Sequence, residues 1–250
     1  MIETSSIFVV IGTFITGGIV KGVIGLGLPI VSLALLTVAI DLPSAMALLL
    51  VPSFVTNIWQ AFVGKDTKVI LHRIWPLLLM ATISVWIGTI VLTRVNLLWL
   101  SMLLGVLLVV YSSINLYGFN LNIKSSQEVW VGMLTGTVNG VLTGMTGSSV
   151  VPGVIYLHAI NLSKDALIQA MGMLFAVSTL SLGLALRQNN LLTIEDGFLS
   201  LAALLPAIVG MIIGQIIRKR LSEQLFRKVF FISLMVLGLY IIVIKIKILI

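Results

Sequence analysis

The sequence has no cysteine, two histidines and eight acidic residues among its 250 positions. Without cysteine the chain cannot form disulfides, hold an iron–sulfur cluster or carry out thiol catalysis. The histidines, His72 and His158, are far apart in the sequence, so they give no support to a histidine-based metal site. We therefore expect neither a metal nor a cofactor.

Sequence motifs of catalysis are also missing. Every acidic residue falls in a loop or at the end of an apolar segment, so we expect no paired carboxylates at depth in a membrane. The chain has no Ser/His/Asp set that could converge, no phosphate-binding lysine motif and no pair of haem histidines. We predict that the protein is not an enzyme and that ATP does not drive it.

Hydrophobic residues make up 59% of the chain and charged residues only 9%. This composition leaves far too little polar surface to coat a soluble globule, and it predicts an integral membrane protein. The formal net charge of +7 does not indicate nucleic-acid binding, because the basic residues stand in short loops beside apolar segments, where they set topology and meet anionic lipid. The predicted partner is the lipid bilayer.

Eight apolar segments fill nearly the whole chain. Six have the length of one membrane-spanning helix of about 20 residues, and they lie at roughly 42–63, 74–93, 96–118, 164–187, 196–217 and 226–244. The other two, roughly 5–40 and 129–160, are too long, since a helix of about 36 residues would measure about 54 Å against a hydrocarbon core of about 30 Å. Each contains a glycine-rich stretch, so we predict two half-helices of roughly 12–15 residues joined by irregular backbone.

The basic loop residues indicate how these segments cross, because Lys and Arg in short loops gather on the cytoplasmic side. If all eight segments cross once, seven basic residues lie on each side, which is no bias. If segment 129–160 enters and leaves on one side, ten residues share a side: Lys65, Lys68, Arg73, Lys124, Lys164, Arg218, Lys219, Arg220, Arg227 and Lys228. Only Arg94, Arg187, Lys245 and Lys247 then lie on the other. We therefore predict a re-entrant hairpin at 129–160.

Treating segment 5–40 in the same way gives two halves, each with one re-entrant hairpin and three membrane-spanning helices. Because three is odd, the halves are inverted relative to one another. The predicted fold is an all-α integral membrane domain of two inverted-topology repeats, residues 1–120 and 125–250, with both termini outside. Proteins of this kind place their substrate near the midplane, where the two broken segments meet.

The two glycine-rich stretches share the spacing G-x3-G-x2-G at an offset of 122 residues. The first runs from Gly18 to Pro29 and contains Lys21, and the second runs from Gly140 to Pro152. A lysine at depth in a bilayer costs roughly 2.5–3.5 kcal/mol on insertion scales, so it normally faces a partner or a wet cavity. Since no carboxylate is expected at depth, we predict that a substrate anion supplies the negative charge. The alternative is that Lys21 snorkels to an interface.

Candidate anion-binding residues follow from the two breaks. Glycine leaves backbone N–H groups open to an anion, and hydroxyl and amide side chains add donors. The predicted substrate-binding residues are Lys21, Gly22, Gly25, Gly27, Asn57, Gln60, Asn139, Thr143, Gly144, Thr146, Gly147, Ser148 and Ser149. Two alternatives stay open: the glycines serve close helix packing, and Asn57 and Gln60 form hydrogen bonds between helices, the role that we expect for Gln169 and Ser178.

The chain resembles the TauE/SafE sulfite exporter family. The resemblance rests on the stretch from Lys21 to Pro29, on Val51-Pro52-Ser53-Phe54-Val55-Thr56-Asn57-Ile58-Trp59-Gln60, and on the second glycine cluster near Gly144. It implies a small protein of the bacterial inner membrane that exports or takes up sulfite, sulfonates and related organic anions. The sequence departs from the family's usual G-x-G-G-G pattern, with Gly25-Leu26-Gly27 in the first cluster and Gly147-Ser148-Ser149 in the second. These changes leave the anion undefined.

We predict a secondary transporter of small anions, namely sulfite, an organosulfonate or a carboxylate, that works by alternating access between two inverted halves. An anion-selective channel on the same hairpins and a non-transporting membrane scaffold or partner subunit are the alternatives. A proton or a sodium ion is the expected coupling ion, although the usual buried carboxylate is missing. A homodimer is one assembly that the sequence allows.

Overall fold

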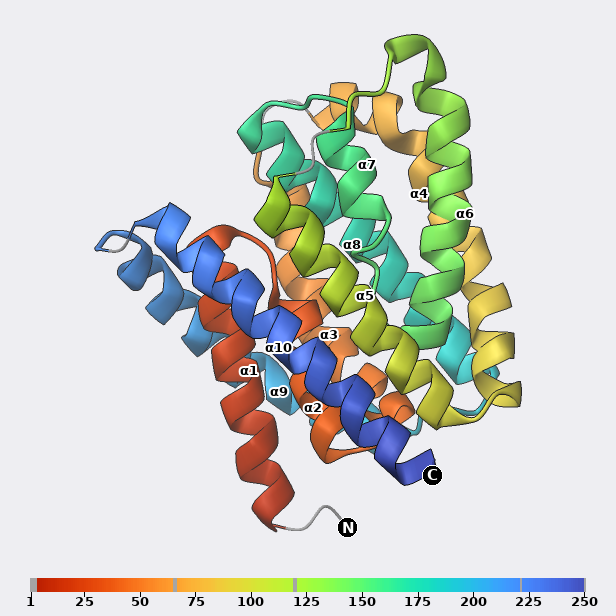
Figure 1. Ribbon diagram of the computed structural model, residues 1–250, viewed down its shortest axis with the longest axis vertical. Helices are drawn as coiled ribbons and strands as arrows, with labels where there is room; N and C mark the ends of the chain where they lie inside the picture. The colour runs from red at the N-terminus through yellow and green to blue at the C-terminus, as the bar shows by residue number, and fades with distance from the viewer. Residues whose placement is uncertain (1–3, 65–66, 119–120, 221, 250) are drawn as a thin grey trace. The chain divides into compact units, whose positions relative to one another are not determined.

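The computed structural model describes residues 4–64, 67–118, 121–220 and 222–249; it is mainly helical and contains no β-strand within these ranges. Lys65, one of the basic residues used to predict topology, lies outside the described residues. The α-helices are α1 (Thr4–Ile24), α2 (Leu28–Ala39), α3 (Leu42–Phe62), α4 (Thr67–Arg94), α5 (Leu97–Tyr117), α6 (Glu128–Thr146), α7 (Gly153–Ala159), α8 (Lys164–Gln188), α9 (Ile194–Arg218) and α10 (Glu223–Leu249), with a short 3-10 helix at Ser125–Gln127 (Figure 1).

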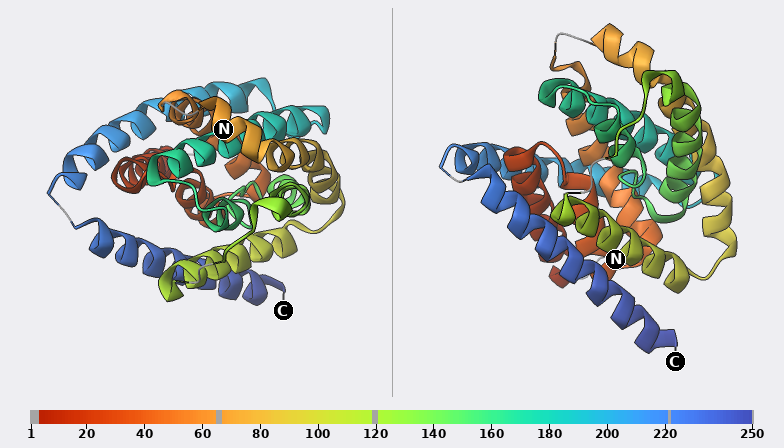
Figure 2. Two further views of the ribbon diagram at one scale, coloured as in Figure 1. Left: turned by 90° about the horizontal axis from the view of Figure 1, so that it is seen from above. Right: turned by 45° about the horizontal axis from the view of Figure 1, so that its top comes forward.

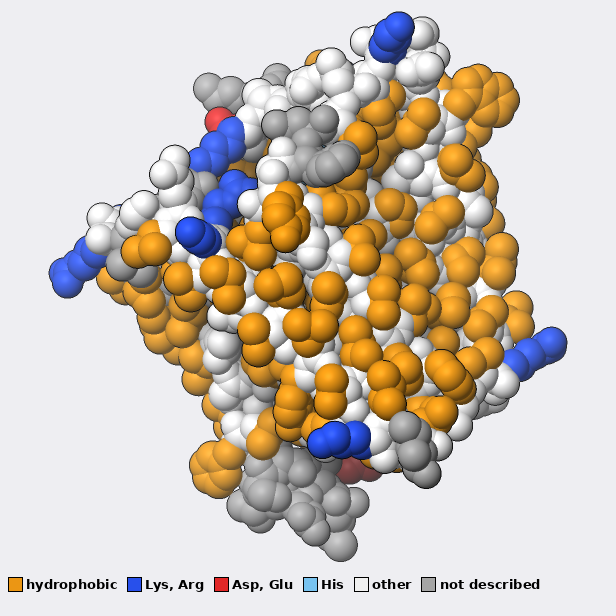
Figure 3. All heavy atoms as spheres, in the orientation of Figure 1, with side chains coloured by type: hydrophobic (Ala, Val, Ile, Leu, Met, Phe, Trp, Pro, Cys, Tyr) orange, Lys and Arg blue, Asp and Glu red, His pale blue; other side chains and the backbone are white. Residues whose placement is uncertain are grey.

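Six of these helices, α3, α4, α5, α8, α9 and α10, are long and apolar enough to cross a membrane. The shortest of the six have 21 residues, which is about 31 Å of helix against a hydrocarbon core of about 30 Å. All six coincide with the six ordinary segments predicted from the sequence, which confirms that part of the prediction. Hydrophobic side chains cover the faces of α5 and α10 seen in Figure 3, as expected of a surface in contact with lipid.

The two long segments are broken as predicted, but the breaks are shorter than expected. Segment 5–40 forms α1 and α2, which are separated by Gly25, Leu26 and Gly27. Segment 129–160 forms α6 and α7, which are separated by residues 147–152. The predicted half-helix length of 12–15 residues holds only for α2, with 12 residues, because α1 has 21, α6 has 19 and α7 has seven.

The chain forms two compact units, which we describe separately. Unit 1 comprises residues 1–52, 95–118 and 193–250, and unit 2 comprises residues 53–94 and 119–192. Each unit therefore contains helices from both predicted repeats. Among the described helices only α3 contributes to both units, since the boundary falls between Pro52 and Ser53.

In unit 1, α1 lies along α9, α10 lies along α5, and α2 contacts α1 and α10 (Figures 1 and 2). Gly18 and Gly22 of α1 face Gly210 and Gly214 of α9, with no room for a side chain between the two backbones. A Cβ on Gly22 would overlap the carbonyl oxygen of Met211. Gly18 and Gly22 therefore belong to helix α1, where they let α1 and α9 approach closely. The break begins only at Gly25.

In unit 2, α6 and α8 both lie against α4. The contact between α6 and α4 repeats the pattern of α1 on α9: Gly140 faces Ala81, and Gly144 faces Gly88 with no space for a Cβ. Gly140 and Gly144 stand 122 residues after Gly18 and Gly22, so the same pair of small residues makes the same kind of crossing in each unit. This packing again delays the break, which begins at Gly147.

Helix α3 contains Pro52, which lacks the N–H that would bind the carbonyl oxygen of Leu48. Ser200 of α9 supplies the missing donor: its hydroxyl donates to that oxygen at 2.9 Å. The same hydroxyl accepts from the backbone N–H of Val51 at 3.0 Å. The buried Ser200 hydroxyl thus provides a hydrogen-bond partner for the Leu48 carbonyl oxygen and for the Val51 N–H.

Candidate functional site

The second break is held by hydrogen bonds between its own residues. Asn139 of α6 accepts with Oδ1 from the backbone N–H of Gly153, 2.9 Å away, which ties the start of α7 to the middle of α6. The Thr143 hydroxyl donates to the Asn139 carbonyl oxygen at 2.7 Å, and the Thr146 hydroxyl accepts from the backbone N–H of Ser148 at 3.3 Å. Gly147 takes a φ of 77°, a conformation that favours glycine, and ends α6.

Two buried polar atoms at this break, and a third on α8, have no hydrogen-bond partner among the described residues. They are Nδ2 of Asn139, the hydroxyl of Ser148 and the hydroxyl of Ser178. Ser178 stands on α8 one turn beyond Leu174, whose side chain lies beside Gly153 at the start of α7. Buried donors normally find partners, because an unsatisfied buried group costs about 1–3 kcal/mol. All three can donate a hydrogen bond, so the set suits an oxyanion.

The ends of α6 and α7 are fastened together. Arg73 of α4 binds the carboxylate of Glu128 through Nε at 2.7 Å and through a second guanidinium nitrogen at 2.5 Å. The same guanidinium donates to the carbonyl oxygen of Ile160 at 2.6 Å. Because Glu128 begins α6 and Ile160 follows α7, the hairpin starts and finishes at the same place. A further hydrogen bond joins the two ends: the Asn161 side chain donates to Oδ1 of Asn122 at 2.9 Å.

The first break also belongs to a hairpin, since Gly17 of α1 lies beside Leu28 and Ser32 of α2. The sequence pattern placed Lys21 in the middle of this break, which is wrong: Lys21 lies in the last turn of α1, and the irregular residues come after it. The reason is again the close contact of α1 with α9, which keeps the residues before Gly25 helical. The Lys21 side chain is buried, with 5% of its surface exposed. A cation in the last turn also suits the negative end of the helix dipole.

The predicted glycines divide into two groups with different surroundings. Gly22 and Gly144 lie against the backbones of α9 and α4, as described above, which is the packing role left open by the sequence. Gly25, Gly27 and Gly147 have positive φ angles of 77°, 116° and 77° and form the breaks themselves. The N–H groups of Gly25 and Gly147 were predicted to be open to an anion, and they are already used: they donate to the carbonyl oxygens of Lys21 at 2.8 Å and of Thr143 at 2.7 Å, and so cap α1 and α6.

Asn57 and Gln60 make hydrogen bonds between or within helices. Asn57 is fully buried and donates to the Ser53 hydroxyl at 3.0 Å, which in turn is 3.2 Å from the Thr179 hydroxyl of α8. Gln60 donates to the carbonyl oxygen of Ile168 on α8 at 2.7 Å. Gln60 therefore joins α3 to α8 directly, and Asn57 does so through the Ser53 hydroxyl.

The remaining predicted residues differ in how their groups are used. Ser149 is buried beside Ser148 in the second break, with 6% of its surface exposed. Gln169 donates to the carbonyl oxygen of Ala61 at 2.9 Å, which confirms its expected role between helices. Ser178 was given the same role and has no partner among the described residues, so it joins the candidate site instead. Sequence reasoning also missed Ser32, whose buried hydroxyl beside Gly17 likewise lacks a described partner.

A signal in the sequence could have found Ser32, namely its spacing from the first break, but no such signal exists for Ser178. Ser32 stands one helical turn into α2 from Leu28, on the face turned toward α1. Ser178 can be placed only through the contact of α8 with α7, which the sequence alone does not give. Within unit 2, the second break offers hydroxyl and amide donors that can hold an anion by hydrogen bonds. Within unit 1, Lys21 is a buried cation beside the first break.

Among the comparisons with known proteins, one gives a match, to a family model. No curated protein and no solved structure matches the chain. The family model described as "Sulfite exporter TauE/SafE" matches residues 9–241, which is nearly the whole length. The chain therefore belongs to the sulfite exporter TauE/SafE family.

Proposed function

We propose that the protein is a secondary transporter of a small oxyanion, either sulfite, an organosulfonate or a related carboxylate, and that it works by alternating access in the bacterial inner membrane. The observation that carries the proposal is a set of buried donors without described partners in unit 2: Asn139 Nδ2 and Ser148 Oγ at the second break, and Ser178 Oγ on α8. An oxyanion presents several acceptors and no donors, so it suits a site that is rich in such donors.

In unit 1, Lys21 beside the first break supplies a positive charge that attracts an anion. Its burial at the end of α1 supports this role, because a lysine inside a membrane protein normally faces a partner or a wet cavity. Gly27, which follows the end of α1, contributes a backbone N–H outside the helix. In unit 2, Asn57, Gln60, Thr143 and Thr146 shape the second break through the hydrogen bonds given above, and Ser149 adds a hydroxyl. Gly22 and Gly144 each hold the helices of their own unit close.

We also propose that both hairpins are re-entrant and that the two halves of the chain are inverted repeats. The closed base of the α6–α7 hairpin supports a segment that enters and leaves on one side. The recurrence of one glycine crossing at an offset of 122 residues supports the repeat. With three membrane-spanning helices following each hairpin, both termini lie outside. A proton or a sodium ion couples transport. The proposed assembly is a homodimer.

Flux measurements in proteoliposomes test the proposed function. The protein is reconstituted, and uptake of labelled sulfite and of a labelled sulfonate is followed as a function of concentration. We expect saturable flux, and we expect Lys21→Gln to reduce it about ten- to hundredfold, because a hydrogen bond to a charged group contributes about 1.5–3 kcal/mol. Lys124→Gln is the matched control: Lys124 is exposed in a loop, and its removal should leave flux unchanged.

Each other outcome decides against a stated part of the proposal. Flux that Lys21→Gln leaves unchanged would remove Lys21 from the site. Flux that rises linearly with concentration would identify a channel in place of a transporter. The absence of flux with every anion tested, in a protein that is shown to be folded by its thermal unfolding, would leave the scaffold alternative.

A further inference from the structure

A cavity with polar and charged residues in its lining lies in unit 1, between α5 and α10. It has a volume of about 440 Å³, within the range of roughly 300–1,000 Å³ typical of small-ligand sites. It opens between the last turn of α5 and the first turns of α10. Its lining residues are Asn115, Leu116, Gln224, Arg227, Lys228 and Phe231.

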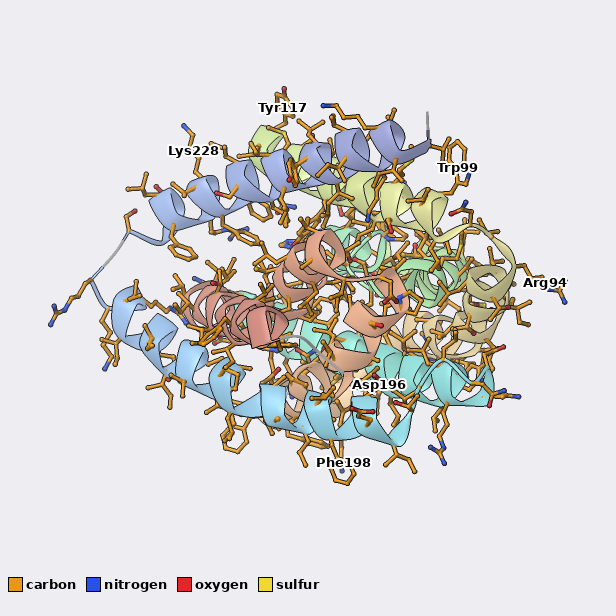
Figure 4. The ribbon with its side chains drawn as sticks, turned by 90° about the horizontal axis from the view of Figure 1, so that it is seen from below. Arg94, Trp99, Tyr117, Asp196, Phe198 and Lys228 are labelled. Atoms are coloured by element: carbon orange, nitrogen blue, oxygen red, sulfur yellow. The ribbon has the colours of Figure 1, made fainter. Side chains whose placement is uncertain are left out.

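Two of the lining side chains are cationic. Arg227 is half-buried and Lys228 is exposed, and Figure 4 shows Lys228 pointing outward from α10. Among the side chains that the structure describes, no carboxylate pairs with either of them. Gln224 adds an amide, and Asn115 donates to the carbonyl oxygen of Tyr111 at 2.8 Å, which leaves its Oδ1 free to accept. The cavity therefore offers two positive charges, amide groups and one acceptor.

The cavity lies at the end of both helices that form it. Asn115 is two residues from the end of α5, and Gln224 is the second residue of α10. Because both helices are long and apolar enough to cross a membrane, their ends reach the level of the lipid headgroups. A guanidinium and an ammonium at this level are positioned to meet phosphate groups.

The surface next to the cavity is apolar. Val106 and Val110 of α5 are exposed, as are Val229, Ile232 and Val236 of α10. Hydrophobic side chains cover these two helices in Figure 3. A ligand with a phosphate in the cavity and hydrocarbon chains along the two helices would match both surfaces, whereas a free anion would use only the first.

We propose that this cavity binds the phosphate headgroup of an anionic phospholipid. Arg227 binds two phosphate oxygens in a bidentate manner, Lys228 adds a second charge, and Gln224 donates to the phosphate. Oδ1 of Asn115 accepts from a headgroup hydroxyl such as those of phosphatidylglycerol. The lipid chains lie along the exposed faces of α5 and α10. This binding is independent of the transport function proposed above.

Lipid retention measured by native mass spectrometry tests the proposal. The purified full-length protein is offered phosphatidylglycerol or phosphatidylcholine at equal concentrations. We expect the wild type to retain phosphatidylglycerol in preference, and R227Q/K228Q to bind it at least about tenfold more weakly. The matched control is K245Q/K247Q, which removes two charges from the other end of the same helix and should keep wild-type retention. The charge-retaining variant R227K/K228R should keep most of the binding, which separates loss of charge from loss of folding.

Two results would overturn the proposal. Equal retention of phosphatidylglycerol by R227Q/K228Q and K245Q/K247Q would show that the cavity does not select the lipid. Inorganic phosphate that raises the thermal unfolding temperature as much as phosphatidylglycerol does, through the same two residues, would assign the cavity to a soluble phosphate. A shift with phosphatidylglycerol alone supports the lipid.

Discussion

Buried polar side chains at the second break divide into those that hold the backbone and those with donors to spare. Thr143 and Thr146 belong to the first group, because their hydroxyls are used within the hairpin. Ser148 and Nδ2 of Asn139 belong to the second. The sequence could predict that these residues gather at one place, since they surround one glycine cluster. It could not separate the two groups, because the division depends on hydrogen bonds that form only after α7 folds back on α6.

Ser148→Ala distinguishes a ligand contact from a structural one. The Ser148 hydroxyl has no described partner, so its removal should leave the thermal unfolding temperature unchanged or slightly higher. If the hydroxyl donates to the transported anion, its loss should raise the substrate concentration at half-maximal flux about ten- to hundredfold.

Ser181→Ala is the control for this substitution. Ser181 is also buried, but its hydroxyl donates to the carbonyl oxygen of Val177 within α8. We expect transport by this variant to match the wild type. A Ser148→Ala protein that unfolds earlier yet transports normally would contradict the assigned role.

At the scale of elements, the breaks show what a glycine motif can and cannot predict. The sequence placed them in the correct segments, because two apolar runs were too long for one helix. It placed them too early in the chain, because a glycine that packs and a glycine that bends look the same in sequence. The structure separates the two kinds: Gly22 faces the backbone of α9, whereas Gly25 adopts a positive φ.

Gly22→Ala tests this distinction against Gly12→Ala in the same helix. A Cβ at Gly22 would overlap the Met211 carbonyl oxygen, so α1 and α9 must separate, at a cost of about 1–3 kcal/mol. A Cβ at Gly12 meets nothing within 4 Å, and the higher helix propensity of alanine should stabilise the protein by up to about 1 kcal/mol. Thermal unfolding in detergent measures both. Equal effects of the two substitutions would contradict the close packing of α1 on α9.

Ser200 and Pro52 should act as a coupled pair. In the wild type, Ser200→Ala removes a donor from the buried carbonyl oxygen of Leu48, which should cost about 1–3 kcal/mol. In a Pro52→Ala background the restored backbone N–H can bind that oxygen, so the same substitution should cost much less. A double-mutant cycle on thermal unfolding measures the coupling. Strictly additive effects would mean that the serine does not compensate for the proline.

At the scale of the whole molecule, hydrophobicity and segment length predicted the six long helices and the two broken segments, and the resemblance of three stretches to a known family predicted the family. The compact units were not predictable in this way. They depend on contacts such as α1 with α9 and α4 with α6, which join helices far apart in the chain. The proposed repeat has its clearest sequence signature in the glycine pair, because most other contacts use interchangeable apolar residues.

Single cysteines placed in the natural cysteine-free chain test the proposed topology. We expect cysteines at Lys68, Lys124, Lys164 and Lys219 to react with a membrane-impermeant thiol reagent from one side, and cysteines at Arg94 and Arg187 to react from the other. The decisive pair is Lys124 and Lys164, which flank the α6–α7 hairpin. Labelling of these two from opposite sides would mean that the hairpin crosses the membrane.

The interleaving of the two units has a consequence for synthesis. All of unit 2 lies between residues 53 and 192, so it can close as soon as that stretch has entered the membrane. Unit 1 instead joins helices from both sides of this stretch, since α1 lies along α9 and α2 contacts α10. The hairpin of α1 and α2, with Lys21 and its glycine face, therefore lacks these partners until α9 and α10 have been made. Unit 2 can close before unit 1, although α1 and α2 precede it in the chain, which differs from the usual N-terminal-first order of folding during translation.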